Sequence, residues 1–168
     1  MRRGAHFAIT PAQRETLLSF ADDEGRWDYV RSVIEVEWDR KHLQETDKAW
    51  DPIHRCLTEH PPGVEELDPD AGTPPLNLCI MGGRQLMEDE YDYIIRLIEP
   101  EQVSPLAEAM WPLDEEWFAR KYRVHCKDAW PEYGEEHCGY AWAYFEDLKY
   151  FFRRMAPRGR PIIFTVAL

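Results

Sequence analysis

The chain has 168 residues and a formal net charge of −12, and apolar and aromatic residues make up 44% and 13% of it. This length suits a single domain (residues 1–168) with a sizeable core, and the apolar content is too high for a disordered acidic tail. The acidity argues against nucleic acid as a partner, because duplex binding depends on Lys and Arg displacing counterions from phosphates.

The negative charge is concentrated in the middle third of the chain. Residues 59–116 hold 15 of the 32 acidic residues and two basic ones, so this block carries −13. Residues 1–58 carry −2 and residues 117–168 carry +3. A field concentrated in this way raises the encounter rate with cations and repels anions. The block therefore predicts a basic partner, with acidity that serves solubility alone as the alternative.

The termini and the apolar runs predict a soluble, cytoplasmic protein. The basic start of the chain is followed by no apolar run long enough for a signal peptide, and no stretch approaches the roughly 18 apolar residues of a membrane span. In that compartment the four cysteines are expected to be reduced thiols. They are Cys56, Cys79, Cys126 and Cys138.

The first third of the chain predicts one strand and three helices. Residues 5–9 are expected to form a strand, and the Thr10-Pro11-Ala12-Gln13 segment then combines an N-cap, Pro at N1 and Gln at N3. A second helix begins near Asp22 or Asp23, and a third covers residues 47–57, where Pro52 marks a fresh start or a kink. The stripe of the second helix is Trp27, Val30, Ile34 and Trp38, and that of the third is Trp50, Ile53, His54 and Leu57.

The rest of the chain predicts an acidic loop rich in Pro and Gly at about residues 59–75, followed by strands and helices in irregular order. The expected strands are residues 76–81, 93–98 and 161–168, and the expected helices are residues 101–110 (interrupted or restarted at 104–105), 114–122 and 135–156. Strands and helices do not alternate regularly. The pattern predicts an α+β domain in which helices pack on a small mixed sheet.

Several of these pieces resemble one bacterial family in their order. The most specific piece is the Asp47-Lys48-Ala49-Trp50-Asp51-x-x-His54 segment. The other pieces also occur in the family's order. They are the opening strand ending in Thr10-Pro11, the residue 76–83 strand with its Gly pair, the Ile98-x-Pro100-Glu101-Gln102-Val103 helix start, the aromatic helix at 144–152 and the final apolar strand. The chain resembles the YfbM-like family, the bacterial domain of unknown function 1877. The resemblance implies an α+β YfbM-like fold and no established activity.

Two departures from the family pattern bear on function. Pro52 stands where the family helix usually has an unrestricted residue. A Gly-rich turn expected before the strand at residue 93 is replaced by the acidic segment 88–92. A family site at that turn would therefore be altered and acidic in this chain.

His54 with Asp51 and Asp47 is the best catalytic candidate. On a continuous helix all three would share a face, and a carboxylate could orient the imidazole as a general base. His54 also lies on the apolar stripe, so a buried histidine satisfied by a helix-start Asp explains the same residues.

Other motifs are weaker. The His125-Cys126 and His137-Cys138 pairs invite zinc, but adjacent ligands point in different directions, and no metal is expected. Gly82-Gly83-Arg84 lacks the spacing of a phosphate loop, and the acids at 88–92 lack the order of a calcium loop. No cofactor is expected.

Two hypotheses of function follow. The first is a non-enzymatic acidic binding protein, in its most concrete form an immunity protein that neutralises a basic toxin. The alternative is an enzyme or small-molecule-binding protein with a pocket near Trp50 and His54. The residues expected to bind the partner are Glu65, Glu66, Asp68, Asp70, Glu88, Asp89, Glu90 and Asp92.

Overall fold

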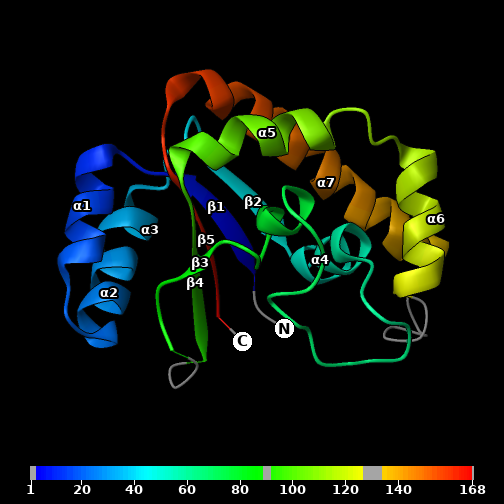
Figure 1. Cartoon of the computed structure of the whole chain (residues 1–168), viewed down its shortest axis with the longest axis horizontal. Coiled ribbons are helices and arrows are strands. Elements are labelled where there is room, and N and C mark those ends of the chain that lie inside the picture. The colour runs from blue at the N-terminus through cyan, green and yellow to red at the C-terminus, as the bar shows by residue number, and fades with distance from the viewer. Residues whose placement is uncertain (1–2, 89–91, 127–133, 168) are drawn as a thin grey trace.

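A five-stranded sheet in the order β2-β1-β5-β4-β3 lies between two layers of helices (Figure 1). The computed structural model describes residues 3–88, 92–126 and 134–167. The strands are β1 (Gly4–Ala8), β2 (Leu43–Asp47), β3 (Arg84–Gln85), β4 (Tyr93–Ile98) and β5 (Ile162–Ala167). Every described pairing between them is antiparallel. The α+β prediction is confirmed, and the sheet is antiparallel where a mixed one was expected.

Side chains alternate between two cores along the strands, because successive residues of a strand point to opposite faces. On β5, Ile162 and Phe164 belong to the larger core and Ile163 to the smaller. The larger core is covered by α4 (Trp50–Thr58), α5 (Pro100–Met110), α6 (Glu115–His125) and α7 (Glu135–Met155). The smaller is covered by α1 (Pro11–Ser19), α2 (Asp23–Tyr29) and the π-helical turn η1 (Val30–Ile34), which leads into α3 (Glu35–Glu37).

Two helices follow their sequence signals closely. The Thr10 hydroxyl accepts from the Gln13 N–H at 3.1 Å, and the Gln13 side chain accepts from the Thr10 N–H at 2.7 Å, so the predicted capping box is formed. The predicted stripe of the long helix is buried along α7 except at Tyr144, which is half-buried. The buried members of the stripe are Ala141, Phe145, Leu148, Phe151, Phe152 and Met155.

The segment around Asp47 differs from the prediction. Residues 43–47 form β2, which pairs with β1, so the helix begins at Trp50 and not at residue 47. Asp47 has a φ of 42°, in the left-handed region, and turns the chain out of the strand. Pro52 lies in the first turn of α4, where a missing N–H costs no hydrogen bond, so the helix has neither a fresh start nor a kink there.

Three smaller expectations also fail. Residues 76–81 were expected to be a strand, but Leu76–Cys79 is a 3-10 helix, because a short buried apolar run fits either state. Trp38 lies beyond the second helix with a φ of 38° and is partly exposed. Helix α5 continues through Pro105, which lies on its exposed side.

Candidate functional site

Helix α4 is buried along its whole length, from Trp50 to Thr58. Its apolar side, including Trp50 and Ile53, packs into the larger core. The acidic loop of residues 59–75 packs against the helix and contains no helix or strand of its own before the proline at 75. The contacts between α4 and residues 59–75 therefore determine which side chains of the loop face the solvent.

A buried ion pair on α4 holds the first part of the loop. The Arg55 Nε donates to the Asp51 carboxylate at 2.6 Å, one helical turn apart, and the two side chains are 2% and 6% exposed. The same guanidinium donates to the carbonyl of Val64 at 2.7 Å and to that of Glu65 at 2.6 Å. Buried charges are tolerated when they are paired and hydrogen-bonded, and this arginine meets both conditions through the loop. The loop backbone at residues 64–65 is therefore part of the charge network.

Two histidines hold the loop as well. The His54 Nε2 donates to the Asp68 carbonyl at 3.2 Å, and the His60 Nε2 donates to the Val64 carbonyl at 3.1 Å. Burial lowers the pKa of His54 to about 4, so its imidazole is neutral at neutral pH. At the far end of the loop, a Cβ on Gly72 would lie 2.9 Å from the Cα of Thr58, so the two backbones are in close contact. The loop is fixed on the helix from both ends.

The structure does not bring the predicted catalytic residues Asp47, Asp51 and His54 together as expected. Asp51 and His54 share α4, but the Asp51 carboxylate is paired with Arg55. Asp47 lies at the end of β2, where its carboxylate accepts from the Tyr140 hydroxyl at 2.9 Å and lies 3.2 Å from the Arg3 Nε. The expectation that all three share a helix face is wrong, because it assumed a helix from residue 47. With His54 1% exposed, its imidazole is a loop contact and is not open to a substrate.

The predicted partner-binding residues fall into two groups on different layers of the molecule. Four of them lie on the held loop with exposed side chains, and we call this group the acidic ledge: Glu65, Glu66, Asp68 and Asp70. Glu88 and Asp92 are exposed at the β3–β4 connection, where the Glu88 N–H donates to Asp23 of α2 at 2.8 Å. Asp89 and Glu90 lie outside the described residues. In Figure 1 the loop of residues 59–75 runs beside α4, whereas the ends of β3 and β4 lie on the side of the sheet nearer α2.

Three other acids of the middle block form ion pairs. Glu99 pairs with Arg14 at 2.6 Å, Glu116 with Arg120 at 2.9 Å, and Glu59 with Lys121. In residues 3–88, 92–126 and 134–167, no ion pair is found for the four ledge carboxylates. Among the described residues, the ledge therefore presents exposed carboxylates without a salt-bridge partner.

The weaker motifs have structural roles. Cys126 and Cys138 are buried free thiols, while His125 donates to the His60 carbonyl at 2.8 Å. Within the described part of the chain, no group of three or more His, Cys, Asp or Glu side chains is placed to share a metal ion. A Cβ on Gly83 would lie 2.7 Å from the Leu97 carbonyl, so this glycine permits close strand contact rather than phosphate binding. Among the residues that the structure describes, no helix is long and apolar enough to cross a membrane.

A cleft that the sequence analysis missed lies on the other layer, where β1 leads into α1. It has a volume of about 370 Å³, and its wall includes Asp39, His42 and Arg160. Its residues come from widely separated segments of the chain. Asp39 and His42, three residues apart and hydrogen-bonded at 2.8 Å, are a local pair in the sequence that could have drawn attention to it.

Comparison with known proteins identifies a family and no activity. The family model described as a domain of unknown function, DUF1877, matches residues 2–165. Among solved structures, the protein of unknown function YfbM from Escherichia coli matches with a TM-score of 0.63 and 18% identity, over 97% of this chain and 98% of that chain. At this identity the likeness shows the fold alone. A search of curated proteins finds no match. The family match spans nearly the whole chain and agrees with the resemblance seen in the sequence, so this protein belongs to the DUF1877, YfbM-like family.

Proposed function

We propose that this protein is a non-enzymatic binding protein of the cytoplasm, whose acidic ledge recognises a basic protein partner. An immunity protein that neutralises a cationic toxin is the most concrete form of this function. The observation that carries the proposal is the use of buried Arg55 and His54 to hold the backbone of residues 64–68 while the carboxylates beside it stay exposed.

Physical reasons connect this arrangement with recognition. Irregular loops longer than about 12–15 residues are uncommon in compact domains and are mostly functional or disordered. Residues 59–75 form such a loop, and α4 holds it in place. A surface that is ordered before binding loses less conformational entropy on association, and its charges speed the encounter with an oppositely charged partner. The alternative pocket near Trp50 and His54 gains no support, since both side chains are buried.

Charge reversal tests the proposal directly. The ledge variant combines Glu65→Lys, Glu66→Lys and Asp70→Lys. Asp68 is kept because its carboxylate accepts the Asp70 N–H at 2.9 Å. The control variant combines Glu15→Lys, Glu146→Lys and Asp147→Lys, which lie exposed within helices α1 and α7 and change the net charge equally. Each protein, and the wild type, is used to capture partners from cells of the native host.

The expected result is a basic protein captured by the wild type and the control variant and lost from the ledge variant. Its association rate with the wild type should fall as salt rises from low to physiological strength, where the Debye length is about 8 Å. The proposal is overturned if the ledge and control variants capture the same proteins, or if the association rate of the captured protein depends on neither salt nor the ledge charges.

A further inference from the structure

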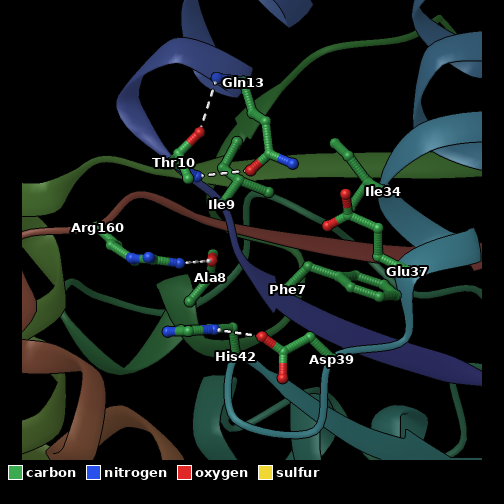
Figure 2. Close-up of a pocket in the computed structure, with 10 residues that line it drawn as sticks. All are labelled: Phe7, Ala8, Ile9, Thr10, Gln13, Ile34, Glu37, Asp39, His42 and Arg160. Atoms are coloured by element: carbon green, nitrogen blue, oxygen red, sulfur yellow. Dashed lines mark hydrogen bonds and ion pairs between the residues drawn. The ribbon is translucent and has the colours of Figure 1, made fainter.

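The cleft on the smaller layer is independent of the acidic ledge and has the form of a ligand site. Figure 2 shows that its floor is apolar, made by Phe7, Ala8 and Ile9 at the end of β1, with Ile34 beside them. Polar side chains stand around this floor. Its volume of about 370 Å³ is at the lower end of the range of about 300–1,000 Å³ typical of small-molecule sites. A ligand of modest size with an apolar part fits this description.

Arg160 provides a cation on one wall. One Nη donates to the Ala8 carbonyl at 3.3 Å, which holds the guanidinium against the floor of the cleft (Figure 2). Arg160 is half-buried, and in the described part of the chain no carboxylate forms an ion pair with it. A guanidinium has five N–H donors in a planar fork that matches a carboxylate. The remaining donors are therefore available to an anionic group of a ligand.

Glu37 and Gln13 provide the complementary groups on another wall. The Gln13 side-chain oxygen is occupied by the Thr10 N–H, so its amide NH₂ points away from Thr10, toward the side of the cleft where Glu37 lies (Figure 2). The Glu37 carboxylate lines the cleft, and no ion pair is found for it among the residues described. The cleft thus holds two opposite charges that do not neutralise each other.

Several hydrogen bonds hold the turn between Glu37 and β2. The His42 Nδ1 donates to the Asp39 carboxylate at 2.8 Å, and that carboxylate also accepts the Lys41 N–H at 3.0 Å. The hydrogen bond from His42 is the largest of the effects that lower the pKa of Asp39. The Arg158 Nη1 donates to the His42 Nε2 at 3.3 Å, and the Ala8 N–H donates to the His42 carbonyl at 2.7 Å. These contacts fix the wall before any ligand arrives.

We propose that this cleft binds a small zwitterion of about the size of an amino acid or a dipeptide. The ligand carboxylate pairs with Arg160, its ammonium group pairs with Glu37, and its apolar side chain lies on the floor of the cleft. The Gln13 amide donates a hydrogen bond to the ligand. Nothing in this proposal depends on the acidic ledge or on a basic protein partner.

The test is a titration of the purified full-length protein, followed by NMR of its methyl and amide groups. The probes are free amino acids and unmodified dipeptides, each compared with its N-acetylated and its C-amidated derivative. The site variants are Arg160→Gln and Glu37→Gln. The control variants, Arg40→Gln and Glu15→Gln, remove one charge of each sign at exposed positions that do not line the cleft.

The expected result is binding of at least one unmodified compound with a Kd of about 0.1–1 mM, with shifts at Ile9 and Ile34. Each site variant should bind it at least tenfold more weakly, and the control variants should bind it as the wild type does. N-acetylation should weaken binding to the wild type and have little further effect on Glu37→Gln, which keeps the test valid if Arg160→Gln fails to fold. The proposal is overturned if no compound binds below about 5 mM, if site and control variants bind alike, or if blocking one charge leaves the affinity unchanged.

Discussion

Two buried histidines should make the folded protein lose stability as the pH falls below neutrality. His6 on β1 is fully buried among Phe151, Phe152 and Phe164, and its Nε2 donates to the Cys79 carbonyl at 2.7 Å. His54 on α4 donates to the acidic loop, as described above. Burial lowers the pKa of each imidazole from 6.5 to about 4, and the backbone hydrogen bond only partly opposes it.

The sign of the effect follows from which state binds more protons. Between pH 6.5 and about 4 the histidines of the unfolded chain are protonated and those of the folded protein are not. The free energy of unfolding therefore falls as the pH falls through this window, and this contribution is fully present above it. From pH 7 to pH 5 each histidine accounts for about 2 kcal/mol, so the pair removes about 4 kcal/mol. Total stabilities are typically about 5–15 kcal/mol, so the loss is easily measured.

Urea denaturation at pH 7, 6 and 5 measures how the free energy of unfolding changes with pH. One substitution tests the part of this change that is due to His54. His54→Gln keeps a side-chain N–H for the Asp68 carbonyl but cannot take up a proton in this range. Its loss of stability from pH 7 to 5 should be smaller than that of the wild type by about 2 kcal/mol. Thr58→Val is the control, since it removes a buried hydrogen bond of 2.8 Å to the His54 carbonyl without changing a titrating group. If His54→Gln and the wild type lose stability in parallel, the reasoning about His54 is wrong.

Four further outcomes are expected. Trp50→Ala should lower the free energy of unfolding by about 3–5 kcal/mol in urea, because the ring is 4% exposed in the larger core. Gly139→Ala should raise it by about 0.5–1 kcal/mol, since this exposed α7 position leaves room for a Cβ. Gly83→Ala should lower it, because its Cβ meets the Leu97 backbone. A thiol reagent should modify the protein only after unfolding, because all four cysteines are buried and burial raises the pKa of Cys79.

Local signals in the sequence were sufficient for the elements that depend on local interactions. The capping box at Thr10 and Gln13 involves residues three apart, so its partners are visible in the sequence. The stripe of α7 repeats at the helical period because one face packs on the sheet, which makes the longest helix readable as well.

Strand β2 was missed because its stability comes from a distant segment. Its sequence, Leu-Gln-Glu-Thr-Asp, has one large apolar residue and no clear alternation. It forms a strand at the edge of the sheet because β1 supplies hydrogen-bonding partners from 36 to 43 positions earlier in the chain. Because β2 is not evident from the sequence, the predicted helix begins too early, at residue 47, and the catalytic trio depends on that start.

The hydrogen bonds that fix the acidic loop on α4 could not be predicted either, but for a different reason. His54 and Arg55 donate to the carbonyls of Val64, Glu65 and Asp68. Every residue has a backbone carbonyl, so such a contact leaves no trace in side-chain identity. The acidic side chains of the loop were visible in the sequence, but not the fact that their backbone is fixed.

The family-like segment at residues 47–54 can now be explained position by position as a structural corner. Asp47 ends β2 in a left-handed conformation and accepts a hydrogen bond from Tyr140 of α7. Trp50 then fills the larger core, Asp51 neutralises Arg55, and His54 holds the loop. A pattern of acids, an aromatic and a histidine that suggests catalysis therefore also suits a strand-to-helix turn that carries a loop.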